Sequence, residues 1–350
     1  MNVNVVDRQR FAACVATGEP YDLLTLKAKV TWRCNLTCSM CSYWRRPGLS
    51  ELSELSTEQW EKVISDAASL GCRKIHFSGG EPLLRSDLEH LVMKATALSL
   101  QVNLTSNGTL LSEERAESLV GAGIHSVTLS IDSPSRKVHD KVRGAGAWRA
   151  TVEGAKRLRR AAKKHRSKVG LRINVVLSKK TYRTAVGVPE LASHLRAKGV
   201  LLIPVDDTEG RGQRLGKRQI QEYNTVAGTR LAAAGIGSSH PFGISARDIS
   251  LSSRGLYALG EYDSQPCLIP WVHSFILPDG QVFPCCMRHG PGPRLGSVAS
   301  ESLVSIWHSR SYMAFRRQLL VAQPVEPCVR CDDFIAENRA LRTLIRERDV

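Results

Sequence analysis

Between about residues 25 and 205, short apolar runs rich in β-branched residues alternate with longer segments of helical periodicity. A strand candidate followed by a helix candidate recurs along this stretch, which predicts right-handed βαβ units and a parallel sheet. Strands are expected at residues 26–32, 74–78, 101–105, 126–131, 170–177 and 200–204, and helices near 57–70, 87–98, 112–122, 148–165 and 189–198. The pattern therefore predicts an α/β fold, a partial (β/α)6 TIM-like barrel with its chemistry at the carboxyl ends of the strands.

The pattern changes on both sides of this barrel. The first residues show no clear period, and the tail brings cysteines, helices and a hairpin turn at Pro278-Asp279-Gly280. The expected division is an N-terminal extension (1–24), the barrel (25–235), a connector rich in Gly and Ser (236–266) and a small C-terminal auxiliary-cluster domain (267–350).

Composition narrows the class of protein. The 350 residues carry 49 Lys and Arg against 33 Asp and Glu, a formal charge of +16, and ten cysteines. No apolar run approaches the length of about 18 residues that a membrane-spanning helix needs, and the first residues lack the apolar core of a secretory signal. We therefore expect a cytoplasmic protein that uses reduced cysteines for metal binding or catalysis.

Three cysteines, Cys34, Cys38 and Cys41, form a C-x3-C-x2-C run just after the first expected strand. Three thiolates this close can hold three irons of a [4Fe–4S] cube and leave the fourth iron open to a ligand. A zinc site is the alternative, although it would need a fourth protein ligand that the nearby sequence does not offer.

The second expected strand ends in the turn Ser78-Gly79-Gly80-Glu81-Pro82, whose glycines allow close backbone approach to a ligand. With the cysteine run one βα unit earlier, the chain resembles the radical S-adenosylmethionine (SAM) superfamily over about residues 25–205. The resemblance implies that the three cysteines bind a [4Fe–4S] cluster and that SAM chelates its open iron. It also implies cleavage of SAM to a 5′-deoxyadenosyl radical that abstracts hydrogen from the substrate.

The resemblance further implies contacts to SAM at the ends of later strands. The turn Gly79–Pro82 corresponds to the segment that meets the methionine amino group, Ser130 and Asp132 to the ribose contact, and Arg143 to an arginine that meets the carboxylate. The full set of expected cofactor contacts is Gly79, Gly80, Glu81, Pro82, Asn107, Ser130, Asp132, Arg143 and Asn174. Asn107 and Asp132 would equally suit ordinary turns, and Asn174 a buried polar pair with Arg172. Met40 departs from the family pattern, which has an aromatic residue before the third cysteine.

A second set of cysteines, with the layout C-x17-C, a long gap and C-x2-C, consists of Cys267, Cys285, Cys328 and Cys331. Four thiolates can fully ligate a second [4Fe–4S] cluster or a structural zinc ion. The segment resembles the Twitch module, the shortened form of the SPASM auxiliary-cluster domain, which favours iron–sulfur. The adjacent Cys286 is interpreted either as a packed thiol or as a hydrogen donor to a substrate radical.

Paired carboxylates, Asp206 and Asp207, follow the sixth expected strand and are candidates to bind substrate or move a proton, or else to cap the next helix. Together with Cys286 they are the expected catalytic residues. The basic run at 157–168 is interpreted as a solvated helix face, because it lacks interleaved aromatic residues. A nucleic-acid partner is therefore not favoured.

Within the superfamily, the short tail and the segment Ile203–Asp207 most resemble enzymes that tailor antibiotic sugars, aminocyclitols and sugar nucleosides. That group includes 2-deoxy-scyllo-inosamine dehydrogenase, neomycin epimerase and cytosylglucuronate decarboxylase. The expected substrate is a carbohydrate-like small molecule that is dehydrogenated, epimerised or decarboxylated, with an acidic flavodoxin or ferredoxin as electron donor and no membrane partner. The first alternative is a maturase of a ribosomal peptide or protein, for which the residues ahead of the barrel are too few to form a peptide-recognition module. The second is a zinc-stabilised protein that binds nucleic acid.

Overall fold

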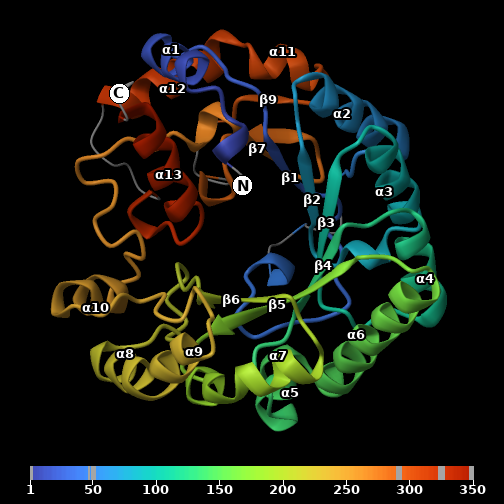
Figure 1. Ribbon diagram of the computed structural model, residues 1–350, viewed down its shortest axis with the longest axis vertical. Helices are drawn as coiled ribbons and strands as arrows, with labels where there is room; N and C mark the ends of the chain where they lie inside the picture. Colours follow the sequence, from blue (N-terminus) through green and yellow to red (C-terminus); the bar gives the residue numbers. More distant parts are fainter. Residues whose placement is uncertain (1–2, 46–47, 49–52, 289–293, 322–327, 347–350) are drawn as a thin grey trace.

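The computed structural model describes residues 3–45, 48, 53–288, 294–321 and 328–346. Six parallel strands form an arc in the order β6-β5-β4-β3-β2-β1, and the helices α2 to α7 follow its outer side (Figure 1). The strands are β1 (Thr25–Lys29), β2 (Lys74–Ser78), β3 (Gln101–Ser106), β4 (Ser126–Ser130), β5 (Gly170–Leu177) and β6 (Gly199–Pro204). The outer helices are α2 (Thr57–Ser69), α3 (Leu88–Ala97), α4 (Glu113–Gly121), α5 (Arg136–Arg143), α6 (Ala147–Lys164) and α7 (Val188–His194). The predicted partial (β/α)6 barrel is confirmed.

Local sequence signals explain the bounds of α2 and the two faces of the strands. Ser56 accepts a hydrogen bond from the Gln59 amide, while the Gln59 side chain accepts one from the Ser56 amide, which forms the expected capping box. In β1, burial alternates so that Leu26 and Ala28 join the core between sheet and helices. Lys27 therefore lies on the other, concave face of the strand, toward the barrel interior.

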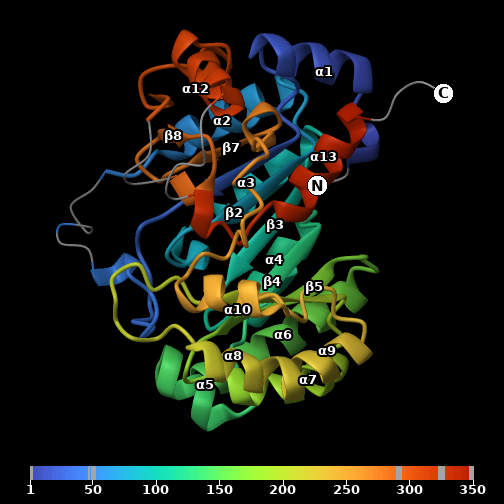
Figure 2. The ribbon, with the colours of Figure 1, turned by 90° about the vertical axis from the view of Figure 1, so that its left-hand side faces the viewer.

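The C-terminal region extends the barrel sheet instead of forming a sheet of its own. Strand β7 (His273–Ile276) pairs in parallel with β1, and β8 (Gln281–Phe283) and β9 (Gly296–Ser297) follow in antiparallel order. Figure 2 shows β7 and β8 beside α12 (Arg310–Val321) at one end of the molecule. The predicted hairpin turn is present between β7 and β8, where Gly280 has a φ of 85°.

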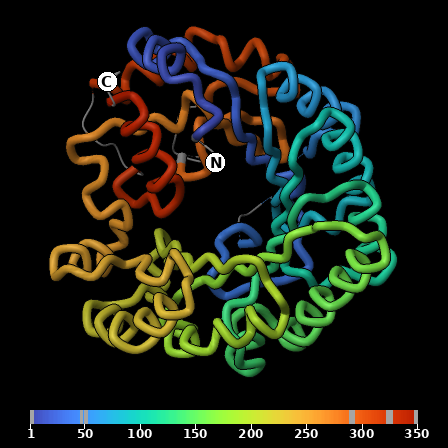
Figure 3. The backbone as a smooth tube through the Cα atoms, in the orientation of Figure 1, coloured from blue at the N-terminus to red at the C-terminus, as the bar shows by residue number. Residues whose placement is uncertain are grey.

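The first helix, α1 (Arg8–Thr17), differs from the expected extension because it packs against α13 (Ile335–Arg346), as Figure 3 shows. Phe11, Trp271 and Leu341 share one buried cluster, and Trp271 Nε1 donates to the Cys14 carbonyl at 3.1 Å. The N-terminal segment is thus tied to the C-terminal region by long-range contacts that its weak periodicity does not reveal.

The remaining helices lie after β6 and in the C-terminal region. They are α8 (Lys217–Tyr223), α9 (Thr229–Ala233), α10 (Ala246–Ser253) and α11 (Leu303–Trp307). Helix α10 falls within the expected connector and contacts α8, so part of that connector is folded onto the barrel. None of the helices in the described ranges is both long and apolar enough to cross a membrane.

Candidate active site

The cysteine loop that follows β1 is fixed mainly through its backbone. The Cys41 amide donates to the Cys38 carbonyl at 3.1 Å, and the Ser39 amide donates to the Val142 carbonyl in α5 at 2.8 Å. On its other side, Gln213 Nε2 donates to the Ser39 carbonyl at 2.7 Å. The loop is therefore held between α5 and the segment that follows β6.

The three thiols of this loop lie near one another, and they differ in exposure. Cys34 is exposed, Cys41 half-buried and Cys38 buried, and burial raises the pKa of Cys38 to about 11, with Cys41 and Cys34 adding to the shift. No three His, Cys, Asp or Glu side chains in the described ranges surround a point where one metal ion would fit. A [4Fe–4S] cube needs no such point because each thiolate takes a different iron, so this donor set fits a cube.

The glycine turn after β2 is seated on the backbone that leads into the cysteine loop. The Gly80 amide donates to the Thr31 carbonyl at 2.9 Å, and the Glu81 amide to the Arg33 carbonyl at 2.8 Å. A Cβ atom at Gly80 would lie 2.2 Å from the Arg33 carbonyl oxygen, and one at Gly79 2.6 Å from that of Thr31. Both glycines are therefore required by the contact between the two loops.

The Glu81 side chain points inward from this turn and is fully buried. It accepts hydrogen bonds from the Leu83 amide, the Ser106 hydroxyl and the Asn107 amide at 3.0, 2.8 and 2.7 Å. Pro82 begins a short 3-10 helix directly after it. The Glu81 carboxylate therefore connects the end of β2 with the end of β3. The part of the turn that remains available to a ligand is its backbone.

Asn107 connects the end of β3 with the cysteine loop. Its Nδ2 donates to Asn35 Oδ1 at 2.8 Å, and its Oδ1 accepts from the Thr109 amide at 2.9 Å. Ser130 and Asn174 are register partners on β4 and β5, and both are half-buried. These three expected contacts lie at the carboxyl ends of neighbouring strands, on the side where the cysteine loop sits.

Asp132 and Arg143 form a bidentate ion pair, with Nε–Oδ2 and Nη2–Oδ1 distances of 2.6 and 2.9 Å. The Asp132 carboxylate is fully buried and also accepts from the Val176 amide at 3.0 Å. The carboxylate thus holds Arg143 in place, while the expected contact of Asp132 to ribose stays a prediction. Burial lowers the pKa of Arg143, but Asp132 and the thiols of Cys38 and Cys41 raise it more. The hydrogen bond between the Ser39 amide and the Val142 carbonyl places the end of α5, and with it Arg143, next to the cysteine loop.

The two carboxylates after β6 do not form a pair. Asp207 is buried and accepts hydrogen bonds from the amides of Arg211, Gln213 and Arg214 at 2.8, 2.9 and 3.2 Å. Its carboxylate thus shapes the segment whose side chains hold the cysteine loop, as a capping group would, and the expected catalytic role of Asp207 stays a prediction. Asp206 is exposed and accepts from the Thr208 amide at 3.2 Å.

The second cysteine set is gathered by the fold. Cys267, Cys328 and Cys331 pack in one cluster with the buried ring of Tyr262. Burial, and then the charges of Cys267 and Cys285, raise the pKa of Cys331, so Cys285 also acts electrostatically on this cluster. The buried Tyr262 hydroxyl faces the sulfur of Cys267, and a thiolate ligand at that position would accept a hydrogen bond from it. This donor set fits an auxiliary cluster.

A polar cluster inside the barrel connects β1 with the auxiliary region. Lys27 forms an ion pair with Asp333 and lies 3.7 Å from the Cys286 sulfur, which itself lies 3.3 Å from Asp333 Oδ2. His273 stands beside this group, where burial lowers its pKa to about 3. The sequence analysis missed Lys27 and Asp333, although a lysine at a lumen-facing strand position and an Asp two residues after Cys331 were visible signals.

A partial barrel with a three-cysteine loop after β1 and a cysteine-bearing extension beyond β7 defines an enzyme that cleaves SAM at an iron–sulfur cluster. A family model described as the Radical SAM superfamily matches residues 29–178, and one described as an iron-sulfur cluster-binding domain, SPASM, matches residues 267–332. The chain belongs to the radical SAM superfamily and carries a SPASM domain. Its cofactors are therefore SAM and a [4Fe–4S] cluster, with further iron–sulfur in the SPASM domain.

Two relatives can be aligned with most of this chain. A PqqA peptide cyclase from Streptomyces rochei is 30% identical over 342 residues, 93% of this chain and 85% of that protein. An AdoMet-dependent heme synthase from Methanosarcina barkeri is 29% identical over 303 residues, 80% of this chain and 81% of that protein.

Solved structures share the fold. Streptococcus suis SuiB bound to precursor peptide SuiA has a TM-score of 0.67 at 15% identity and covers 88% of this chain and 70% of that chain. The enzyme anSMEcpe with bound AdoMet has a TM-score of 0.62 at 20% identity and covers 89% and 87%.

Proposed function

We propose that this radical SAM enzyme modifies a peptide or protein, as a maturase of a ribosomally made precursor. The observation that carries the proposal is the 30% identity to a PqqA peptide cyclase across 93% of this chain. The expected carbohydrate substrate and antibiotic-sugar role have no support among these relatives, whose names point to a peptide or to heme. The peptide maturase, the alternative in the sequence analysis, replaces them.

The site residues fit this chemistry in distinct roles. Cys34, Cys38 and Cys41 would hold the cluster, and the guanidinium of Arg143 beside them would attract the carboxylate of SAM. The backbone of the turn at Gly79 and Gly80 would face its amino group. When bound, cluster and SAM supply a 5′-deoxyadenosyl radical that takes a hydrogen atom from the substrate.

The auxiliary cysteines are proposed to ligate a second [4Fe–4S] cluster through Cys267, Cys285, Cys328 and Cys331. Cys286 is set apart from this group because its sulfur contacts Lys27 and Asp333. With four thiolate ligands, the second cluster has no open iron, which suits it to accept or deliver an electron. The donor is expected to be an acidic flavodoxin or ferredoxin, in keeping with the +16 charge of the chain.

The test is co-expression of the enzyme with each short peptide encoded beside its gene, followed by mass spectrometry of the peptides. We expect one peptide to change mass, and the purified enzyme to release 5′-deoxyadenosine faster when that peptide is present. A Cys38→Ala variant is the matched control and should leave the peptide unchanged. Turnover of a sugar or of a porphyrin carboxylate with every peptide inert would overturn the proposal.

A further inference from the structure

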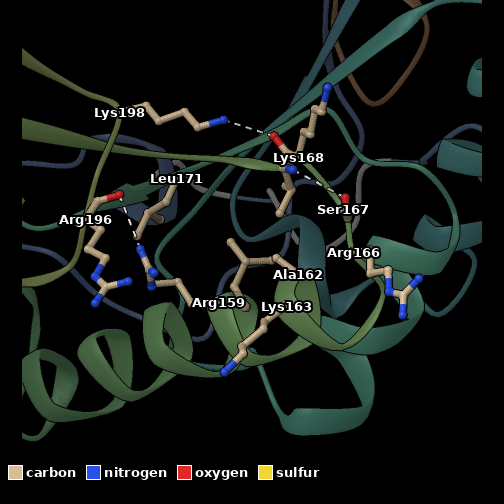
Figure 4. A pocket seen from close by; sticks show the side chains of 11 residues that line it. Arg159, Ala162, Lys163, Arg166, Ser167, Lys168, Leu171, Arg196 and Lys198 are labelled. Carbon is tan, nitrogen blue, oxygen red and sulfur yellow. Dashed lines mark hydrogen bonds between the residues drawn. The ribbon is translucent and has the colours of Figure 1, made fainter.

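A hollow of about 440 Å³ lies at the amino-terminal end of β5, between the end of α6 and the segment that follows α7 (Figure 4). Its centre is apolar, with Ala162 and Leu171 between the charged side chains. Among the described residues, no acidic side chain lines it. Its six cations are Arg159, Lys163, Arg166, Lys168, Arg196 and Lys198. Lys163 and Arg166 belong to the basic run at 157–168, and both are exposed, as expected for a solvated helix face.

Two of these cations are engaged by backbone carbonyls. Arg159 Nη1 donates to the Leu195 carbonyl at 3.3 Å, and Lys198 Nζ donates to the Lys168 carbonyl at 3.1 Å. The side chains of the other four make no ion pair with a carboxylate in the described ranges of the chain. The hollow thus gathers positive charge that no carboxylate of the described ranges balances.

The other cations of α6 provide an internal comparison. Arg160 pairs with Glu113 of α4 at 3.0 Å, and Lys164 pairs with Glu117 at 2.7 Å. One side of the helix is therefore matched in charge to its neighbour, whereas the side that lines the hollow is not. A general excess of lysine and arginine would not divide the helix in this way.

Helix ends account for only part of the charge. Helices α6 and α7 both end at the hollow, and each carboxyl end carries about half a negative charge, so together they offset about one of the six cations. Arg166 and Arg196 each follow a helix end with a φ of 51°, a left-handed position that usually favours glycine. About five positive charges remain around the apolar centre.

We propose that this hollow binds an acidic segment of the peptide substrate, an inference that rests on the proposed peptide-modifying function. Its volume is that of a ligand site, and its apolar centre suits an aliphatic side chain between peptide carboxylates. No aromatic residue lines it, so it lacks the stacking platform that a single-stranded nucleic acid uses. Free phosphate would meet the cations but leave the apolar centre uncovered.

A second hollow adjoins the first at the edge of the sheet. It measures about 590 Å³, shares Lys198 with the first, and continues along Gly199 and Leu201 of the edge strand β6 to Arg172. The strand β5 spans about 26 Å between the cationic hollow and the candidate active site. About eight extended residues between the acidic segment and the modified residue would cover that distance.

The test is fluorescence anisotropy of a labelled peptide of Glu and Leu residues with the full-length, cluster-loaded protein, at low and at physiological salt. We expect binding that weakens with salt, and that weakens about tenfold in the variant Lys163→Gln/Arg166→Gln. The matched control is Arg160→Gln/Lys164→Gln, which removes the same charge from the paired side of α6 and should retain the affinity within about twofold. If the first variant does not fold, Lys168→Gln/Arg196→Gln tests the same hollow.

Equal losses in both variants, or equal binding of a peptide with Gln in place of Glu, would overturn the inference. The contrary result is that a single-stranded RNA binds more tightly than the peptide and loses this binding in Lys163→Gln/Arg166→Gln. That result would overturn the peptide inference and make the hollow a nucleic-acid site. The assay measures binding without turnover, so it separates the two proposals. If the enzyme modifies a peptide but the hollow binds none, only this inference is overturned. If the hollow binds the acidic peptide but no peptide is modified, only the proposed function is overturned.

Discussion

The two cysteine sets sit on the same sheet and are held in place in different ways. Cys34, Cys38 and Cys41 share one loop, which backbone hydrogen bonds tie to α5 and to the segment after β6. The auxiliary cysteines come from segments far apart in the chain and meet only because β7 pairs with β1 and the tail folds back. The first site is thus held together by contacts of one short loop. The second depends on tertiary contacts between the barrel and the tail, among them the ion pair of Lys27 with Asp333.

We call Cys34, Cys38 and Cys41 the local set, and the four auxiliary cysteines the tertiary set. The largest effect is expected from removing the local set, in the variant Cys34→Ala/Cys38→Ala/Cys41→Ala. Iron should fall from about eight to about four atoms per chain, because each [4Fe–4S] cube carries four. Release of 5′-deoxyadenosine should fall to background. Iron analysis after anaerobic reconstitution and chromatography of the nucleoside check both.

The control for this variant is Cys72→Ala. Cys72 is buried, which raises its pKa to about 12, and it lies outside both sets, so its removal should cost only about 1 kcal/mol of stability. Iron should remain at about eight atoms. A triple variant that still cleaved SAM would refute the assignment of the loop.

The contact between the glycine turn and the cysteine loop can be broken by Gly80→Ala. The added Cβ would lie 2.2 Å from the Arg33 carbonyl oxygen, so backbone must move and the free energy of unfolding should fall by about 1–3 kcal/mol. Affinity for SAM should fall about tenfold, as the displaced loop carries both the thiols and the turn. Denaturant unfolding and SAM binding are the measurements.

Gly121→Ala is the matched substitution, since a Cβ there meets no atom within 4 Å. It lies at the end of α4, so alanine should leave stability unchanged or raise it by up to about 1 kcal/mol. If Gly80→Ala and Gly121→Ala lowered the free energy of unfolding and the affinity for SAM equally, the close contact between turn and loop would not require a glycine at position 80.

The same contrast explains what the sequence reveals. The six barrel strands and the capping box at Ser56 depend on neighbours in the chain, and the fold agrees with both expectations. The spacing of Cys34, Cys38 and Cys41 is equally local, and their role as cluster ligands stays a prediction. The pairing of β7 with β1 and the packing of α1 on α13 depend on distant partners, which periodicity does not encode.

Individual site residues show the same limit. Asp207 follows a strand end as a catalytic carboxylate would, and it also accepts hydrogen bonds from three amides of its own loop. Asp132 is likewise engaged by Arg143 and Val176 before any ligand arrives. Residue type and position predicted that both lie at the carboxyl end of the barrel, but not which hydrogen bonds engage them.

The tertiary set can be tested through its link to the barrel with Lys27→Met. The pair with Asp333 is half-buried, so its loss should lower the free energy of unfolding by about 1–2 kcal/mol, between the values for exposed and buried pairs. Removing a positive charge near the auxiliary cysteines should also lower the reduction potential of their cluster. Redox titration followed by electron paramagnetic resonance should show this change in the auxiliary signal alone.

Lys156→Met is the control, because it removes an exposed lysine paired with Glu153 on α6. Stability should change by less than about 0.5 kcal/mol, and both cluster signals should be retained. If Lys27→Met shifted the reduction potentials of both clusters, the ion pair of Lys27 with Asp333 would not act on the auxiliary cluster alone.

The smallest effect concerns pH at the same junction, where His273 lies between β1 and the tail. His273 is 1% exposed, and burial followed by the charge of Lys27 lowers its pKa to about 3. Below its ordinary pKa of about 6.5, the unfolded chain binds a proton that the folded chain refuses, so stability falls as pH falls. Between about pH 7.5 and about pH 6, this histidine should contribute a loss of about 0.8 kcal/mol.

Denaturant unfolding of His273→Phe under anaerobic conditions should lack that part of the pH slope. Thr25→Val removes the hydroxyl that lies 2.8 Å from His273 Nδ1 without removing the titrating ring, so this variant should keep the slope. His273 faces Lys27 and the ring of Phe334, so the missing part of the slope reports on the junction between β1 and the tail. Equal slopes in His273→Phe and the native chain would show that the junction does not sense pH through this residue.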